Sequence, residues 1–297
     1  MEYLPAAMTT QVSESVQASE SGRDTSAEFA AGMTTAARHQ FALNDVRGGL
    51  KLWRLAWSLG WLDIRLRYRG SMLGPFWLTI STGVMVGALG VLYSALFHMT
   101  LRDYLPFLAL SQVLWGFLST LVSESCQAFT ESEPVIRSMR MPYFLFAMRI
   151  LIRNVLVLGH NVFVIVVVFL LFQIWPGGTA LLALPALPLW ILDAMALSLL
   201  LGGVCARYRD ILPIVNSVMQ IAFFLTPVIW KPEQLGEGAA WLPLNPFYAL
   251  LEIVRGPLLG EAPSLAVWAG ALGYSIALWA AAWTFFMRSR GRISFWI

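Results

Sequence analysis

The scarcity of charge is the most informative feature of this sequence. Asp, Glu, Lys and Arg make up 12% of its 297 residues, roughly half the share that is usual in a soluble domain. Hydrophobic residues make up 58%, and the mean hydropathy is +0.67. A soluble fold of this size cannot hide so much apolar surface from water. The composition therefore predicts that lipid surrounds most of the chain.

The sequence also lacks the motifs of the common enzyme classes. Neither of its two lysines, Lys51 and Lys231, follows a glycine, so no Walker A phosphate loop is present. The three histidines have no Cys or Glu at the spacing of metal ligands, and no Gly-x-Ser-x-Gly elbow or pair of external carboxylates indicates hydrolysis. We therefore expect no catalytic residue, no metal site and no cofactor in this chain. If ATP drives the protein, a partner ATPase binds the ATP and its Mg²⁺.

The apolar residues are gathered into six long runs, each close to the length of about 20 residues that a membrane-spanning helix needs. The runs are apolar all round, which argues against the amphipathic helices of a large soluble protein. The predicted fold class is therefore an all-α polytopic membrane protein with six transmembrane helices. The expected spans are about 74–97, 104–125, 145–172, 181–204, 211–230 and 263–287.

The positions of Lys and Arg predict the orientation of these spans. If the N-terminus is cytoplasmic, 17 of the 20 basic residues lie on the cytoplasmic side, and Arg102, Lys231 and Arg255 lie outside. Basic residues collect in cytoplasmic loops, so both termini are expected in the cytoplasm. The net charge of +3 then follows from topology. The sequence indicates no basic soluble face, so we expect no binding to nucleic acid.

The chain before the first span divides into a tail and an amphipathic helix. Residues 1–44 are polar and contain no apolar run, which predicts a disordered cytoplasmic tail without a signal peptide. From 45 to 69, tryptophans and aliphatic residues recur every three or four positions beside basic residues, which predicts a helix lying in the membrane interface. Gly70, Gly74 and Pro75 then predict a hinge, because the chain has to turn there into the first span.

Two connections between spans carry recognisable patterns. Residues 128–141, on the cytoplasmic side, are polar at first and then combine a short apolar stripe with two arginines, which predicts a short helix in the cytosol. Residues 231–262, on the outer side, contain apolar stretches that are too short to cross, which predicts half-helices dipping into the outer leaflet. No internal repeat is visible, and this weakens the case for an inverted-repeat secondary transporter.

Several segments together resemble the permease subunits of bacterial polysaccharide ABC exporters. The resemblance is strongest to the O-antigen type (Wzm-like), with capsule and teichoic-acid exporters as relatives. It covers about residues 45–297, with the segments in the same order throughout. The segments are WLDIRLRYRGSMLGPFW, WGFLSTLVSES, VIRSMRMP, ARYRDILPIVNSVMQIAFFLTPVIW, LNPFYALLEIVRGPLLG and FFMRSRGRISFWI.

The resemblance implies a homodimer in the bacterial inner membrane that binds two copies of a cytoplasmic ABC ATPase subunit. A channel between the protomers would carry an undecaprenyl-linked glycan, with the first and fifth spans as its lining. The interfacial helix (45–68) and the loop after the second span (128–141) would contact the ATPase. Residues 245–259 would form short outer gate helices.

Aromatic and polar residues on the first and fifth spans are candidates for the channel lining. Aromatic faces stack on sugars without fixing one register, which suits a sliding polymer. For each aromatic residue, a place in an interfacial belt or against lipid is the simpler alternative, and the polar residues could serve ordinary contacts between helices. The candidates are Phe76, Trp77, Tyr93, Asn216, Gln220, Phe223 and Phe224.

The cytoplasmic side offers two further candidate sites. The loop after the second span would transmit ATPase movement, unless it is only a basic anchor; its candidates are Glu131, Glu133, Val135, Ile136, Arg137 and Arg140. Arg149 and Arg153, one turn apart, could bind the pyrophosphate of the lipid-linked glycan, since guanidinium groups match phosphate oxygens. The alternative to this role is that both side chains snorkel, extending toward the lipid headgroups.

The sequence leaves other functions open. The same architecture could export capsule polysaccharide, teichoic acid, a drug or a small lipid. Asp193, in the middle of the fourth span, would be the coupling residue of a proton-driven secondary transporter, or else a packing residue that is protonated or hydrogen-bonded. A membrane glycosyltransferase or acyltransferase is disfavoured, because no cluster of polar catalytic residues is visible on either side.

Overall fold

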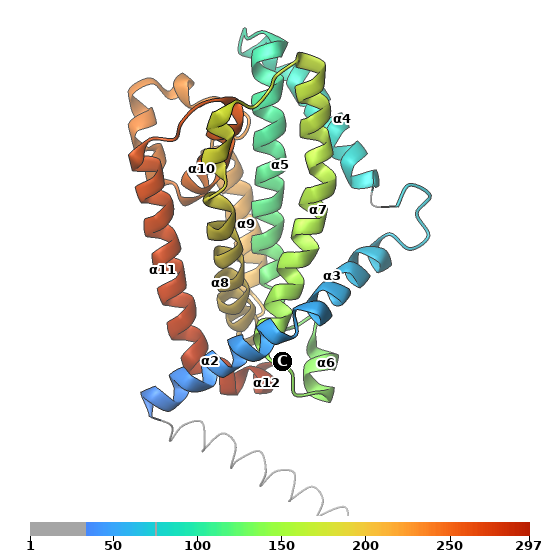
Figure 1. Ribbon diagram of the computed structural model, residues 1–297, viewed down its shortest axis with the longest axis vertical. Coiled ribbons are helices and arrows are strands. Elements are labelled where there is room, and N and C mark those ends of the chain that lie inside the picture. Colours follow the sequence, from blue (N-terminus) through green and yellow to red (C-terminus); the bar gives the residue numbers. More distant parts are fainter. Residues whose placement is uncertain (1–33, 75) are drawn as a thin grey trace, which may run out of the picture.

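The computed structural model describes residues 34–74 and 76–297, and every regular element in this part of the chain is helical (Figure 1). Five of these helical segments are long and apolar enough to cross a membrane. This confirms the prediction of an all-helical, multi-pass membrane protein. The five are α4 (Phe76–Leu96), α5 (Leu101–Ser125), α7 (Tyr143–Phe172), Gly178–Arg207, which contains η1 (Gly178–Ala183) and α8 (Ala186–Arg207), and Leu265–Trp296, which contains α11 (Leu265–Ser289), η3 (Arg290–Arg292) and α12 (Ile293–Trp296).

The predicted span 211–230 differs from the rest. Its helix, α9 (Ile211–Leu225), has 15 residues and extends about 22 Å, less than the hydrocarbon thickness of about 30 Å. The helix ends early because Thr226 has extended backbone angles, as expected of a residue before proline. Two further elements follow on the chain, η2 (Pro232–Leu244) and α10 (Pro246–Leu259).

Helix α5 forms the centre of the bundle. It packs against α4, α7, α8, α9 and α10, and most of its side chains are buried. The outer helices α4 and α11 bury far fewer residues, so their remaining surfaces face outward (Figure 1). The main cluster of buried hydrophobic residues draws on nearly every helix of the bundle, with Phe129, Leu145 and Phe286 among its fully buried members.

The interfacial region consists of two helices that cross the lower end of the bundle in Figure 1. They are α2 (Thr35–Lys51) and α3 (Trp53–Arg67), separated by a break at Leu52. The sequence placed the end of the tail at residue 44, and that boundary needs correction. Residues 1–33 lie outside the described part, whereas 35–44 are helical, with the Thr34 hydroxyl accepting a hydrogen bond from the Ala37 amide at 3.3 Å. The start was missed because small residues such as Ala42, rather than large apolar ones, carry its buried face.

Asp45 explains why α7 begins at Tyr143. Pro142, the residue before the helix, offers no capping side chain. Instead, the buried carboxylate of Asp45 on α2 accepts hydrogen bonds from the amides of Tyr143 at 3.2 Å and Phe144 at 3.0 Å. It also accepts one from Arg290 Nε at 2.7 Å, beyond the end of α11. A negative group at a helix N-terminus is favourable, so this one carboxylate joins three separate elements.

The connection between α3 and α4 contains two glycines with left-handed backbone angles. Gly70 has φ 86° and Gly74 has φ 55°, a region that residues with a Cβ rarely adopt. A Cβ at either position would meet no atom within 4 Å, so the conformation alone requires glycine. These angles agree with a turn at the predicted hinge of Gly70, Gly74 and Pro75. The third hinge residue, Pro75, lies outside the described residues. The turn carries the chain from the interfacial helices into α4.

Close contact between α2 and α7 depends on Gly49. An added Cβ would lie 2.8 Å from Phe144 Cβ and 3.1 Å from the Leu145 main-chain nitrogen, atoms that cannot move without the backbone. We predict that Gly49→Ala lowers the stability of the folded protein by about 1–3 kcal/mol through overpacking. Thermal unfolding in detergent would measure this loss. Gly159→Ala, on α7 where a Cβ meets nothing within 4 Å, is the matched control, and equal stability of the two variants would contradict the prediction.

Candidate functional site

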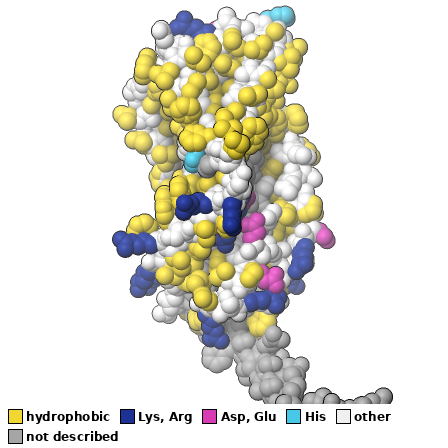
Figure 2. Space-filling model, turned by 90° about the vertical axis from the view of Figure 1, so that its right-hand side faces the viewer, with side chains coloured by type: hydrophobic (Ala, Val, Ile, Leu, Met, Phe, Trp, Pro, Cys, Tyr) yellow, Lys and Arg dark blue, Asp and Glu magenta, His cyan; other side chains and the backbone are white. Residues whose placement is uncertain are grey.

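A network of charged side chains joins the interfacial helix to the membrane-spanning helices. Figure 2 shows acidic and basic side chains side by side in the lower part of this face, beneath an upper part that is mainly hydrophobic. Six charged residues of this region are joined to one another by ion pairs, and we call these six the charge network. Its members are Asp63 and Arg67 on α3, Glu124 on α5, Glu131 after α5, and Arg149 and Arg153 on α7.

Arg149 binds Asp63 through two parallel hydrogen bonds. Its Nε lies 2.7 Å from Asp63 Oδ2, and its Nη2 lies 2.6 Å from Asp63 Oδ1. Arg149 Nη1 also donates to the hydroxyl of Ser132 at 3.3 Å. Paired contacts of this kind between guanidinium and carboxylate are among the strongest hydrogen bonds in proteins, and they fix orientation as well as distance. They fasten α3 to α7.

Arg153 is the most buried member of the network, with 4% of its surface exposed. Its Nε lies 2.8 Å from Glu124 Oε2, and its Nη1 lies 3.2 Å from Glu131 Oε2 and 3.6 Å from Asp63 Oδ2. Its Nη2 is buried and has no hydrogen-bond partner in the described part of the chain. Three carboxylates from three segments therefore converge on one guanidinium group.

Glu124 extends the network to the end of α3. Its Oε1 accepts a hydrogen bond from Arg67 Nη2 at 2.9 Å, and its Oε2 accepts another from Asn154 Nδ2 at 2.7 Å. Burial lowers the pKa of Arg67, but the hydrogen bond and charge of Glu124 raise it by more, so the net shift is upward. The guanidinium group therefore stays charged, and the last turn of α3 is held against α5.

The network bears on the predicted pyrophosphate site at Arg149 and Arg153. Three basic and three acidic side chains make it electrically balanced, and both arginines already hold carboxylates. A diphosphate would have to exchange with one of those carboxylates. The pyrophosphate role itself stays a prediction. Sequence reasoning missed Asp63 and Glu124, although a single acid in a strongly basic helix and an acid at the end of an apolar span were visible signals.

The loop after the second span contains a short helix, α6 (Glu133–Ser138). Glu133 and Arg137 form an ion pair at 2.9 Å, and Arg137 Nη2 donates to the main-chain oxygen of Ile297 at 2.5 Å. Val135 and Ile136 pack partly buried against the main hydrophobic cluster. Of the six candidate coupling residues, Arg140 is exposed and forms no ion pair with another described residue, and Glu131 belongs to the charge network.

The candidate channel residues lie on α4 and α9, which contact different sides of α5. Helix α4 packs on α5 and α7, and α9 packs on α5 and α8. Phe76, Trp77, Asn216, Gln220 and Phe224 are exposed, as the channel prediction requires. The other two aromatic candidates are partly buried: Tyr93 stacks on Phe97 at 5.5 Å, and Phe223 packs against Trp115 at 5.8 Å between ring centres. Lining of a channel is untested for all seven residues.

Helix α5 carries a polar stripe that sequence reasoning did not single out. Its partly exposed residues recur at helical spacing along one face, and they are Gln112, Gly116, Ser119, Thr120 and Ser123. Gln112 Nε2 approaches Met85 Sδ on α4 at 3.8 Å, and Gln112 Oε1 is buried without a hydrogen-bond partner among the described residues. The signal was present in the spacing of polar and small residues within an otherwise apolar run.

Arg255 organises the opposite end of the bundle. Only 1% of its surface is exposed, although the sequence suggested merely an outer-side residue. It donates to Glu252 on its own helix, to Ser111 Oγ on α5 at 2.8 Å and to the Pro227 carbonyl at 2.5 Å. Its guanidinium carbon lies 4.5 Å from the centre of the Phe107 ring. Arg255 therefore ties α10 to α5 and to the chain that follows α9.

Asn245 makes a second link between α10 and the end of α9. Its Oδ1 caps α10 by accepting hydrogen bonds from the amides of Phe247 at 3.0 Å and Tyr248 at 3.3 Å. Its Nδ2 donates to Thr226 Oγ1 at 3.0 Å. The early end of α9 and the start of α10 are therefore fixed to each other.

Asp193 lies buried between α8 and α11. Its Oδ2 accepts a hydrogen bond from Ser275 Oγ at 2.7 Å, and no basic residue in the described part of the chain pairs with it. Its Oδ1 and the indole nitrogen of Trp279, one turn beyond Ser275, are both buried without a hydrogen-bond partner there. The hydrogen bond fits the packing alternative more directly than it fits proton coupling.

Comparisons with known proteins identify the family to which the sequence is similar. The profile of the family described as "ABC-2 type transporter" matches residues 54–259. An O-antigen export system permease protein RfbA from Myxococcus xanthus is 23% identical over 201 residues, which cover 65% of this chain and 76% of that protein. A protein of the same name from Klebsiella pneumoniae is 18% identical over 191 residues, covering 64% of this chain and 74% of the relative.

The pair of Asp63 and Arg149 can be tested as a coupled unit. We predict that Asp63→Asn and Arg149→Gln each lower stability by about 1–3 kcal/mol, because each leaves a partly buried charge without its partner. The double variant should lose less than the sum of the two, by roughly 1 kcal/mol or more. Thermal unfolding of all four proteins in detergent measures the cycle. Asp210→Asn, at an exposed acid that forms no ion pair with another described residue, is the control, and additive losses at the pair would contradict the link.

Proposed function

Because this chain belongs to the ABC-2 type transporter family, whose profile covers more than half of its length, we propose that it is the transmembrane subunit of an ATP-driven exporter of O-antigen. The exporter would move the lipid-linked polysaccharide across the bacterial inner membrane. The names of the relatives support this substrate. ATP and Mg²⁺ would be bound by a separate cytoplasmic ABC ATPase, and this chain would contribute no catalytic residue.

The observation that carries the proposal is the open face of α9. Within this apolar helix, Met219 and Ala222 are buried, while Asn216 and Gln220, one turn apart, are exposed. A polar side chain pointing into hydrocarbon is costly. The exposed face therefore needs water, a polar cargo or a second protein surface beside it. A homodimer with an aqueous channel at this face would give the side-chain amides of Asn216 and Gln220 polar partners.

The polar stripe of α5 supports the same location for the channel. The stripe lies on a helix that contacts both α4 and α9, and the buried Gln112 Oε1 lacks a partner among the described residues. The partly exposed hydroxyl groups of Ser119, Thr120 and Ser123 can exchange hydrogen bonds with glycan hydroxyl groups or with the water that accompanies them. Phe224 and the aromatic residues at the start of α4 would stack on sugar faces.

The finer topology belongs to the proposal. We infer six spans, with α9 and the chain that continues it to Trp230 as the fifth, and with both termini cytoplasmic because of the distribution of arginines. Helix α10 has 14 residues and extends about 21 Å, too little to cross. It would act with η2 as a re-entrant outer gate, held to α5 and to the end of α9 by Arg255 and Asn245.

The charge network supports a mechanism for coupling. The ATPase would push on α3 and on the loop 128–141, and α3 is fastened to α5 and α7 through Asp63, Arg67 and their partners. Movement of α3 would reach α4 through the turn at Gly70 and Gly74. Arg149 and Arg153 remain candidates for the pyrophosphate of an undecaprenyl carrier, by exchange with their carboxylate partners.

Reconstitution would test the function. The chain and its ABC ATPase, in proteoliposomes, should move undecaprenyl-linked O-antigen across the bilayer only when ATP is hydrolysed. Capsule polysaccharide, teichoic acid and a lipophilic drug would be compared under the same conditions. Preferred transport of any of these, or transport that persists without the ATPase and fails with the proton gradient, would overturn the proposal.

The polar face of α9 can be tested in the same assay. We predict that Asn216→Leu together with Gln220→Leu slows glycan export by roughly 30-fold, because two hydrogen bonds worth about 1 kcal/mol each are lost along the path. ATP hydrolysis should continue. Val218→Leu, at an exposed apolar position of the same helix, is the control and should export normally. Unchanged export by the double variant would remove α9 from the channel.

The loop 128–141 can be tested by charge reversal. We predict that Arg140→Glu, at the exposed end of this loop, uncouples ATP hydrolysis from export, because an acidic residue would repel the surface that accepted the arginine. Arg137→Glu should have the same effect and would also break the ion pair with Glu133. Arg102→Glu, at the opposite end of the bundle, is the control. Full coupling in both loop variants would show that the loop is only an anchor.

A further inference from the structure

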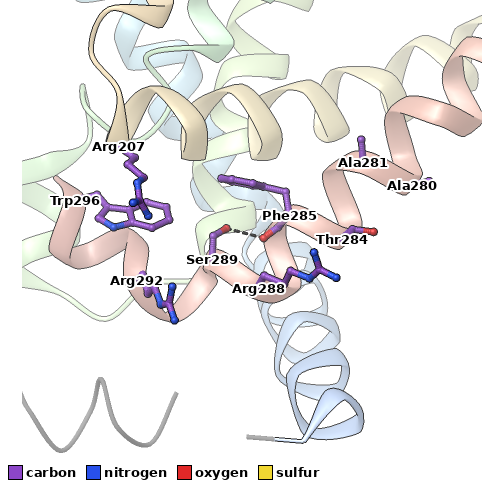
Figure 3. Close-up of a pocket in the computed structure, with 9 residues that line it drawn as sticks. All are labelled: Arg207, Ala280, Ala281, Thr284, Phe285, Arg288, Ser289, Arg292 and Trp296. Carbon is purple, nitrogen blue, oxygen red and sulfur yellow. Dashed lines mark hydrogen bonds between the residues drawn. The ribbon is translucent and has the colours of Figure 1, made fainter. Parts of the chain in front are cut away.

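Three arginines gather around a hollow at the end of the bundle where α8, α11 and α12 meet. The hollow has a volume of about 560 Å³ and is open to the surface. Figure 3 shows the residues that line it. Cavities of this size hold small ligands and headgroups. We call it the arginine hollow. Its lining residues are Arg207, Ala280, Ala281, Thr284, Phe285, Arg288, Ser289, Arg292 and Trp296.

The lining changes character along the axis of α11. Ala281, Thr284, Arg288 and Arg292 follow one another at three- and four-residue steps, so they share one face of the helix and its continuation. The sequence of side chains runs from small and apolar, through a hydroxyl, to two cations. A phospholipid has the same order of groups, from acyl chain through glycerol ester to phosphate.

Arg207 supplies the third cation from the end of α8. Its guanidinium carbon lies 5.2 Å from the centre of the Tyr208 ring and 5.3 Å from that of the Trp296 ring. Contacts with two aromatic faces orient the guanidinium group without occupying its N–H donors. Figure 3 shows Arg207 beside Trp296, on the side of the hollow opposite α11.

The charges of the hollow lack the acidic partners that other arginines of this end possess. Arg149 and Arg153 bind carboxylates of the charge network, and Arg290 binds Asp45. For Arg207, Arg288 and Arg292, by contrast, no ion pair occurs within residues 34–74 and 76–297. All three arginines are exposed, and an anion bound between them would reduce the repulsion among their positive charges.

We propose that the arginine hollow binds the phosphate headgroup of an anionic membrane phospholipid. Arginine matches phosphate oxygens through paired hydrogen bonds, and basic pockets between membrane helices on the cytoplasmic side are suited to such headgroups. Thr284 offers a hydroxyl donor at the level of the glycerol esters. The site is separate from the glycan path, which the proposed function assigns to α4, α5 and α9.

The surroundings of the hollow favour a lipid over a soluble anion. Beyond Ala280 and Ala281, α11 continues as an exposed apolar surface that includes Ile276, 61% of which is exposed. An acyl chain can lie along this surface, whereas free phosphate would gain nothing from it. Gly203 on α8 makes room for the ring of Phe285, since a Cβ there would lie 2.4 Å from Phe285 Cε1. This close contact closes the hollow on its inner side.

Lipid binding to the purified full-length chain tests the proposal. Phosphatidylglycerol would be titrated in detergent and its binding measured by native mass spectrometry, with zwitterionic phosphatidylethanolamine and soluble glycerol 3-phosphate as comparisons. The triple variant Arg207→Gln, Arg288→Gln, Arg292→Gln should bind phosphatidylglycerol on the order of 100-fold more weakly, because each basic residue near an anionic lipid contributes about a fivefold factor.

Two further proteins separate the site from general surface charge. The control triple variant Arg47→Gln, Arg65→Gln, Arg69→Gln removes the same charge from exposed arginines of α2, α3 and the turn, and it should weaken phosphatidylglycerol binding clearly less than the first triple variant does, because these arginines line no shared cavity with the hollow. Ala281→Trp keeps all three cations but fills the hollow, and it should weaken binding as the first triple variant does. This variant also decides the matter if the first triple variant does not fold.

Three results would overturn the proposal. The first is equal weakening by both triple variants, or undiminished binding by Ala281→Trp, because the attraction would then not depend on the hollow. The second is binding of glycerol 3-phosphate as tight as that of phosphatidylglycerol, which would indicate a soluble phosphate ligand. The third is unchanged lipid affinity together with lost association of the ABC ATPase in the first triple variant, which would make the hollow a protein docking surface.

Discussion

Polar and charged groups inside the hydrocarbon of a bilayer are stabilised when the protein supplies their partners, because hydrocarbon supplies none. In this structure, the need of buried polar groups for hydrogen-bond partners determines which helices are joined. Asp45 satisfies the first amides of α7 and the guanidinium group of Arg290, and Arg255 satisfies a free carbonyl beyond α9 while it pairs with Glu252. Asp193 takes a hydrogen bond from Ser275. Each buried polar group thus connects helices that apolar packing alone would hold less specifically.

The two ends of the bundle use this requirement differently. At the end that holds α2 and α3, one bidentate ion pair joins α3 to α7, so these helices would have to move together if a force were applied there. At the other end, a single buried guanidinium group holds α10, α5 and the chain after α9 at one point. The turn between α3 and α4 contains two glycines with left-handed backbone angles, Gly70 and Gly74, where an added Cβ would meet no atom within 4 Å.

The sequence allowed prediction of the features that depend on neighbouring residues. Runs of about 20 apolar residues gave five helices of spanning length, and glycine spacing indicated the turn before α4. It could not give pairings such as Asp45 with Arg290 or Ser111 with Arg255, which join residues 245 and 144 positions apart. The early start of α2 was missed because alanine and glycine carry its buried face. The end of α9 at Leu225 was missed because hydropathy continues past the proline that stops the helix.

The same requirement identifies surfaces that this chain leaves incomplete. The exposed face of α9 presents amide side chains where a membrane helix would present aliphatic ones, and the arginine hollow presents cations where the neighbouring arginines have carboxylates. The two surfaces differ in charge and in chemistry. The neutral amides of α9 favour water, hydroxyl groups or another protein, whereas the positively charged guanidinium groups of the hollow favour an anion. They also belong to different helices: α9 packs on α5 and α8, while the hollow is built on α11, α12 and the last turn of α8. Because amides and guanidinium groups prefer different ligands, the proposals made for the two surfaces assign them different partners.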